Sequence, residues 1–142
     1  MTQNNIAFRR AKAMVTYGDL SAARRAFAEL DSQDPTIAAW VAYCDYLLSP
    51  VSLREEPASR GKRAKLTLKR LAAPNPEENF EVLTLYAKVC HLAGETELAR
   101  ACLVRVLRME PENADALSAY RALKTTPEPS RPRLGWLRFW RR

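Results

Sequence analysis

Residue types that build catalytic and metal sites are scarce in this chain of 142 residues. It has one histidine, His91, and three widely spaced cysteines, Cys44, Cys90 and Cys102. Metal sites need closely spaced cysteines or several histidines, and the sequence has neither. A glycine-rich phosphate loop and a recognisable serine or cysteine nucleophile are also missing. We therefore expect a non-enzyme without metal or cofactor, in which the cysteines are small core residues.

Long apolar runs are absent too. None approaches the roughly 18 to 20 residues that cross a bilayer, and the opening stretch, MTQNNIAFRRAKAM, has no apolar signal-peptide core. Hydrophobic residues make up 47% of the chain and charged residues 27%, which is typical of one folded globular domain. We expect a cytoplasmic protein and leave open a peripheral attachment to the inner face of a membrane.

The chain carries a net charge of +7, and two of its basic stretches contain no acidic residue. Residues 131–142, RPRLGWLRFWRR, hold five arginines and no acid, and the rest of the chain has 18 basic against 16 acidic residues. The other stretch contains Arg60, Lys62, Arg63, Lys65, Lys69 and Arg70. Because the excess charge is local, we do not expect a nucleic-acid surface over the whole molecule.

Helical periodicity runs through almost the whole chain, and strand-like alternation is nearly absent, so the sequence predicts an all-α fold. Glycine and proline punctuation divides it into segments of ordinary helix length. The seven expected helices cover residues 5–17, 20–32, 36–48, 60–72, 78–93, 96–109 and 113–124.

The second, fourth and sixth of these helices share one spacing, with offsets of four, seven and twelve positions. Each has a small residue, then two apolar residues on the same face, then a proline that ends the unit. The three sets are Ala23, Phe27, Leu30 and Pro35; Ala64, Leu68, Leu71 and Pro76; and Ala99, Leu103, Val106 and Pro111. The shared spacing predicts a structural repeat.

Two segments with this spacing, GDLSAARRAFAELDSQDP and GETELARACLVRVLRMEP, resemble the second half of a tetratricopeptide repeat. The preceding helices support the resemblance with a pattern of a large residue, a large and small pair, and another large residue. That pattern is Trp40, Tyr43, Cys44 and Leu47; then Leu83, Tyr86, Ala87 and Cys90; and, with a poorer fit, Ala7, Arg10, Ala11 and Met14. An insertion of about seven residues separates the two helices of the second unit.

The resemblance implies a right-handed α-solenoid of three helical hairpins with a capping helix. Its expected parts are repeats at about 4–35, 37–76 and 80–111, a capping helix at 113–124, a proline-rich tether at 125–133 and a basic-aromatic segment at 134–142. We expect Asn113 to cap the last helix, whose apolar residues would cover the third hairpin. Those residues are Ala116, Leu117, Tyr120 and Leu123.

In this family the first helices of the hairpins line a concave groove for a segment of a partner protein. The family pattern places nine residues of this chain there: Asn5, Phe8, Lys12, Val41, Asp45, Glu81, Thr84, Lys88 and His91. Some members clamp a C-terminal carboxylate with lysines, asparagines and an arginine. That clamp is absent here, because Phe8 and Lys12 stand where lysine and asparagine would be and Glu81 replaces a lysine. As ordinary alternatives, the lysines fit a solvated helix surface and His91 fits a helix end.

The basic-aromatic segment, LGWLRFWRR, is the most unusual part of the composition. In a helix, four apolar side chains would share one side and the arginines would lie mostly on the other. These docking residues are Trp136, Leu137, Arg138, Phe139, Trp140, Arg141 and Arg142. Three interpretations stay open: binding at the surface of an anionic membrane, insertion into another protein, and folding back onto the chain's own repeats.

The sequence thus predicts a non-catalytic, cytoplasmic adaptor or scaffold. A protein segment would bind in the groove, and the basic-aromatic segment would dock to a second protein or a membrane. One alternative is a chaperone similar to the three-repeat chaperones of bacterial type III secretion, which would hold an export substrate. Another is a basic protein associated with nucleic acid through residues 60–70 and the arginines of 131–142; we regard nucleic acid as the weaker partner.

Overall fold

The computed structural model describes residues 2–30, 33–72 and 79–125, with the side chains of residues 6–30, 33–72 and 79–124. These ranges contain seven α-helices, one short 3-10 helix and no strand, which confirms the expected all-α fold. The helices are α1 (Thr2–Thr16), α2 (Leu20–Ala28), α3 (Pro35–Leu48), α4 (Arg60–Ala72), α5 (Phe80–Leu92), α6 (Thr96–Met109) and α7 (Ala114–Thr125), with the 3-10 helix η1 (Val51–Leu53) after α3. One end differs clearly from expectation: α2 stops four residues before the predicted end at 32.

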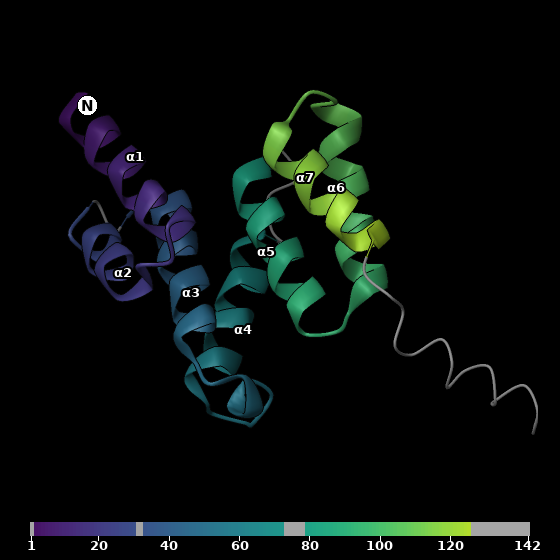
Figure 1. Cartoon of the computed structure of the whole chain (residues 1–142), viewed down its shortest axis with the longest axis horizontal. Coiled ribbons are helices and arrows are strands. Elements are labelled where there is room, and N and C mark those ends of the chain that lie inside the picture. Colours follow the sequence, from purple (N-terminus) through teal and green to yellow (C-terminus); the bar gives the residue numbers. More distant parts are fainter. Residues whose placement is uncertain (1, 31–32, 73–78, 126–142) are drawn as a thin grey trace, which may run out of the picture.

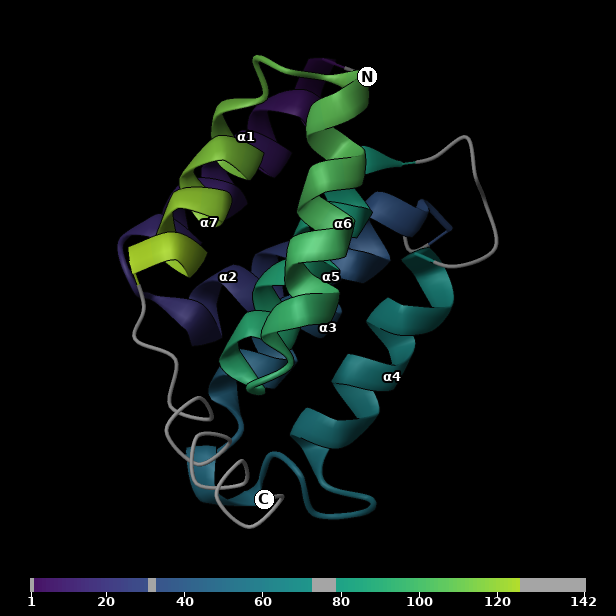
Figure 2. The same ribbon diagram turned by 90° about the vertical axis from the view of Figure 1, so that its right-hand side faces the viewer.

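Each helix packs against the next one along the chain, and α5 also contacts α3 and α7. Figure 1 shows α1 and α2 at one end of the molecule, α6 and α7 at the other, and α3, α4 and α5 between them, and α6 and α7 lie together on the face seen in Figure 2. No helix in the described ranges is long and apolar enough to cross a membrane.

The shared spacing of the second, fourth and sixth helices corresponds to one buried stripe on each of them. The small residues Ala23, Ala64 and Ala99 are at most 5% exposed. The residues four positions later, Phe27, Leu68 and Leu103, are at most 1% exposed. A full-sized residue in place of the alanine would collide with the neighbouring helix, so the small residue and the apolar stripe have a common physical cause.

The first and third hairpins turn in the same way. Gly18 and Gly94 follow α1 and α5 with φ of 86° and 87°, a left-handed conformation that glycine adopts without strain. The next residue closes the helix end in both cases: the amide of Asp19 donates to the Met14 carbonyl at 2.9 Å, and that of Glu95 to the Cys90 carbonyl at 2.8 Å. This matching geometry is independent of the apolar pattern that predicts the repeat.

The second hairpin turns differently, because the predicted insertion lies between α3 and α4. Arg54 reaches back from it and donates from Nε to the carbonyls of Tyr46 and Ser49, and from Nη2 to that of Leu47. Tyr46 and Leu47 belong to the last turn of α3 and Ser49 is its C-cap, where a helix runs out of amide donors for its carbonyls. An arginine side chain thus closes α3 where glycine turns close α1 and α5.

Side-chain caps set three helix starts. Asp34 accepts the Thr36 amide at 2.9 Å before α3, and Asn79 accepts the Val82 amide at 3.2 Å before α5. Asn113 accepts the Ala116 amide at 2.9 Å, which confirms its predicted role before α7.

Helices α3 and α5 form the centre of the fold, and their cysteines lie in the core as expected. Cys44 and Cys90 are fully buried, Cys102 on α6 is half-buried, and none of the three forms a disulfide. Burial raises the pKa of Cys44 to about 12 and that of Cys90 to about 11. These thiols are therefore protonated at neutral pH and poorly nucleophilic.

Candidate functional site

A polar hollow near the predicted groove lies where α1, α5 and the start of α7 converge. This polar hollow has a volume of about 490 Å³. Its lining includes Lys12, Glu81 and Thr84, three residues of the predicted groove, together with Asn79, Phe80, Glu110, Asn113 and Asp115. The structure thus brings residues from the first and third hairpins to one place.

Glu81 is the centre of the contacts at this end. Its Oε2 atom accepts a hydrogen bond of 2.7 Å from Trp40 Nε1 and lies 3.2 Å from Lys12 Nζ. One carboxylate on α5 therefore connects to α3 and to α1. The indole N–H is buried with its ring, so losing this acceptor would leave a buried donor unsatisfied.

Thr84 does not offer a free hydroxyl to a ligand. Its side chain is 1% exposed, and its Oγ1 donates to the Phe80 carbonyl at 2.7 Å. The residue shapes the wall of the polar hollow, and the polar groups at the surface of that hollow come from other side chains.

A second hollow continues along α5 and α7 and shares Asp115 with the first. This apolar hollow has a volume of about 260 Å³. Six of its lining residues are apolar or aromatic: Tyr43, Ala87, Leu92, Leu103, Ala119 and Ala122. The predicted groove residues Lys88 and His91 also line it, with Ser118 at its edge. We name the two hollows together the α5–α7 trough.

Three helices meet at Asp115. Lys88 Nζ lies 2.8 Å from Asp115 Oδ1 and 5.9 Å from the centre of the Tyr43 ring. Burial, together with the negative charge of Asp115, raises the pKa of Tyr43 to about 12, so its hydroxyl is neutral and able to donate. The junction between the two hollows thus presents a lysine, a carboxylate and a phenol.

Phe8, which the family pattern places on the groove surface, packs mainly inward. Its ring meets those of Phe27 and Trp40 edge to face, with centroids 5.8 and 6.5 Å apart. Phe27 and Trp40 are stacked at 5.3 Å, and Lys12 Nζ lies 4.8 Å from the centre of the Phe8 ring. This cluster joins α1 to α2 and α3.

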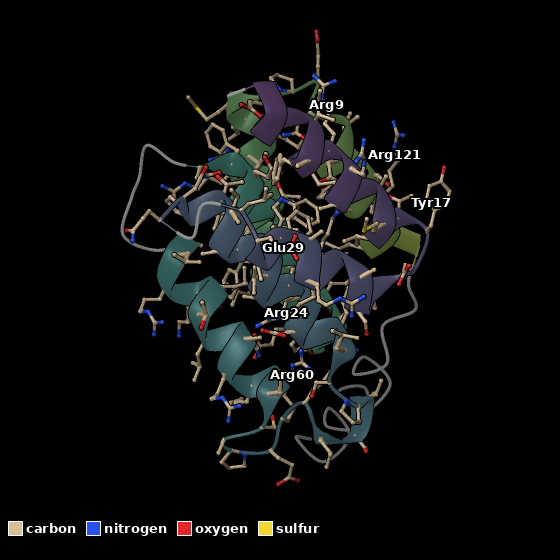
Figure 3. The ribbon with its side chains drawn as sticks, turned by 90° about the vertical axis from the view of Figure 1, so that its left-hand side faces the viewer. Arg9, Tyr17, Arg24, Glu29, Arg60 and Arg121 are labelled. Atoms are coloured by element: carbon tan, nitrogen blue, oxygen red, sulfur yellow. The ribbon has the colours of Figure 1, made fainter. Side chains whose placement is uncertain are left out.

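Val41 and Asp45 lie on another side of α3, away from the trough. They line a separate arginine hollow of about 450 Å³ between α2 and α4. Asp45 is held there by Arg24 at 3.0 Å and by Arg60 at 2.6 Å. Figure 3 shows these two arginines close together on one side of the molecule. The nine residues of the predicted groove therefore do not form one surface; Asn5, whose backbone is in α1, has its side chain outside the described part.

The basic stretch of α4 is partly neutralised within the molecule. Arg60, Lys62 and Lys65 pair with carboxylates of other elements at 2.6, 3.2 and 2.8 Å. Burial would by itself lower the pKa of Lys65, but the hydrogen bond and charge of Glu95 outweigh it and raise that pKa. Part of this charge thus serves the fold.

Two trough residues were missed by sequence reasoning. Tyr43 fits the core pattern of its helix, and Asp115 lies in a helix whose expected role is only to cover the third hairpin. An acidic residue in the first turn of a helix also fits the helix dipole, so Asp115 carried no distinctive signal. Contact between α3, α5 and α7 gives both residues their position.

The predicted docking residues Trp136, Leu137, Arg138, Phe139, Trp140, Arg141 and Arg142 lie outside the described residues. Within the described part, no three histidine, cysteine, aspartate or glutamate side chains gather to hold a metal ion. Comparison with protein-family models, curated proteins and solved structures finds no match to the chain.

Proposed function

We propose that the chain is a non-catalytic binding module that holds a segment of a partner protein in the α5–α7 trough. The observation that carries this proposal is the adjacency of a polar and an apolar hollow, which meet at Asp115. Such a mixture of apolar floor and a few polar groups is typical of sites that bind extended or helical peptides.

The arrangement favours recognition of a segment over chemistry. The buried thiols have raised pKa values, and the charged groups at the trough are paired with one another: Lys12 with Glu81, and Lys88 with Asp115. Paired charges on fixed helices can exchange partners with a bound chain and so provide specificity. The apolar hollow would take an apolar side chain of the same segment.

We propose further that the hairpins form a tetratricopeptide-like solenoid. The common buried stripe of α2, α4 and α6 and the matching glycine turns after α1 and α5 support a repeat. In an adaptor of this kind, the basic-aromatic segment provides a second contact, to another protein or to an anionic membrane surface.

A displayed library of random twelve-residue peptides tests the trough directly. Peptides selected on the immobilised chain are labelled, and their binding is measured by fluorescence anisotropy. We expect Ser118→Arg, which places a long side chain at the edge of the apolar hollow, to weaken binding about tenfold or more. Lys88→Glu should weaken it as well, because it breaks the pair with Asp115.

Ser21→Arg is the matched control, since Ser21 is an exposed residue of α2 and lines neither part of the trough. It should leave the affinity within about twofold, and circular dichroism should show equal helicity in all variants. The trough would be rejected as the binding site if Ser118→Arg and Ser21→Arg weakened peptide affinity equally, or if neither changed it.

A further inference from the structure

The α5–α7 trough and the basic-aromatic segment complement each other in chemistry. The apolar hollow is walled by Tyr43, Leu103 and small alanines, and the polar hollow has the carboxylates of Glu81, Glu110 and Asp115. Residues 134–142 supply two tryptophans, a phenylalanine, two leucines and three arginines without an acid. We propose that this segment of the chain itself occupies the α5–α7 trough until a partner displaces it.

Charge favours the trough over the other helix surfaces. Its two lysines face three carboxylates, whereas α4 has six cations and no acid, and α2 has two arginines and no acid. Helix α6 carries three arginines against Glu97. Three of the six cations of α4 are paired with carboxylates, so its repulsion of an arginine-rich segment is weaker than that count implies. The trough attracts the segment, because its carboxylates outnumber its lysines.

The connection is long enough for the segment to return. Residues 126–133 follow α7 directly, and eight extended residues reach about 26 Å. Helix α7, with 12 residues, is about 18 Å long. The basic-aromatic segment can therefore reach back along the whole of α7 to both hollows, which lie along that helix and its start.

Return to the trough also removes the aromatic side chains of the segment from water. Exposed tryptophan and phenylalanine side chains bury 150 to 250 Å² each, roughly, when they enter an apolar site. An intramolecular contact costs less than a bimolecular one, because a short tether gives an effective concentration on the order of millimolar. A partner must then compete with the segment, and its capture releases the segment for a second contact. This inference rests on the proposed function of the trough.

The test uses the full chain and a labelled peptide with the sequence of residues 131–142. In the silenced chain, Trp136→Ser, Phe139→Ser and Trp140→Ser remove the aromatic side chains of the segment. We expect the peptide to bind the silenced chain and to bind the intact chain about tenfold more weakly or worse, because the intact segment competes. A peptide with the same three substitutions is the control and should not bind.

Binding to the silenced chain should also depend on the trough. Ser118→Arg and Glu110→Lys should each weaken it about fivefold or more, and Ser21→Arg should leave it unchanged. Equal affinity for intact and silenced chains, or indifference to Ser118→Arg and Glu110→Lys, would overturn the proposal.

Two further measurements separate other occupants. Sedimentation velocity should show a monomer at every concentration; a dimer that the silencing substitutions abolish would assign the segment to a second copy and overturn the contact within one chain. Vesicles containing phosphatidylserine should not bind the peptide while the silenced chain is in excess. If they do, the segment prefers a lipid surface to the trough and the proposal fails.

A further outcome distinguishes this inference from the proposed function. If selected library peptides bind the silenced chain and the segment peptide does not, this inference is overturned and the proposed function stands.

Discussion

Helices α5 and α4 have equal length and opposite surroundings. Eight of the 13 residues of α5 are buried, against four of the 13 in α4. Helix α5 contacts α3, α4, α6 and α7, whereas the principal contacts of α4 are with α3 and α5. A peripheral helix needs one apolar stripe and can carry charge elsewhere, and α4 carries six cations. A central helix must be apolar on several sides, so its sequence does not reveal which side faces a ligand.

The largest expected change in stability comes from comparing one leucine on α5 with one on α4. Leu85 on α5 is fully buried, and Leu66 on α4 is 50% exposed. Leu85→Ala should lower the free energy of unfolding by about 3 kcal/mol, because it leaves a cavity in a closely packed centre. Leu66→Ala should change it by less than about 0.5 kcal/mol. Urea denaturation followed by circular dichroism measures both, and similar losses would show that α5 is not the structural centre.

A carboxylate pair gives the next largest contrast. Glu81→Ala removes the acceptor of the Trp40 indole and the partner of Lys12, and should cost about 1 to 2 kcal/mol of unfolding free energy. Glu55→Ala breaks an exposed pair with Lys62 and should cost only a few tenths, about 0.3 kcal/mol.

Glu81→Gln separates the hydrogen bond to Trp40 from the ion pair with Lys12. Its amide oxygen can still accept from the indole, while the ion pair is lost. It should recover most of the stability that Glu81→Ala removes. A loss as large as that of the alanine variant would show that charge, and not the acceptor for Trp40, dominates.

A smaller loss of stability is expected at the glycines that follow α1 and α5, where side-chain burial plays no part. A Cβ atom added at Gly18 or Gly94 would meet no atom within 4 Å, so the cost of substitution is conformational. Gly18→Ala and Gly94→Ala should each cost about 1 kcal/mol, because φ is positive at both. Asparagine, which tolerates this conformation, should cost less at both positions. Thermal denaturation would detect unequal losses and so challenge the equivalence of the two hairpins.

The smallest effect is a pH dependence that the central helices should confer. The pKa values of Cys44 and Cys90 are raised to about 12 and about 11, so the folded state holds these protons more tightly than the unfolded chain. Their contribution is complete below about pH 8 and is lost as the pH rises from there toward 11 and 12. At pH 9 the loss is roughly half a kcal/mol per thiol. The double variant Cys44→Ala, Cys90→Ala should therefore lose less stability than the parent between pH 8 and 9, and a parallel decline would contradict this.

The sequence predicted the all-α class and the seven helices well, because the residues that start and end helices act locally. Proline at the start of α3, the Asn113 cap and the glycines after α1 and α5 act within a few residues of where they stand. Ala23, Ala64 and Ala99 likewise mark a buried stripe on helices with only one such side. The end of α2 was predicted too late because Leu30 continues the apolar spacing past Ala28.

The candidate site was predicted only in part, for a reason that lies in α3. Its apolar residues occupy several faces, and the family pattern placed Val41 and Asp45 on the groove. The contacts with α2 and α4 instead turn these two residues toward the arginine hollow, and Tyr43 lines the trough. Orientation about the axis of a central helix depends on neighbours distant in sequence, which periodicity does not contain.

Because Arg54 closes the end of α3, the corner between α3 and α4 is a suitable place to insert a foreign sequence. Ser49 and the Cγ atom of Arg54 already lie within 3.0 Å of where a Cβ atom on Gly61 would stand, so this glycine is a fixed point of the corner. Residues between these anchors, such as Val51 at 75% exposure, hold little of the fold. An epitope or a fluorescent reporter could therefore be grafted at this corner with the hairpin still anchored at both ends.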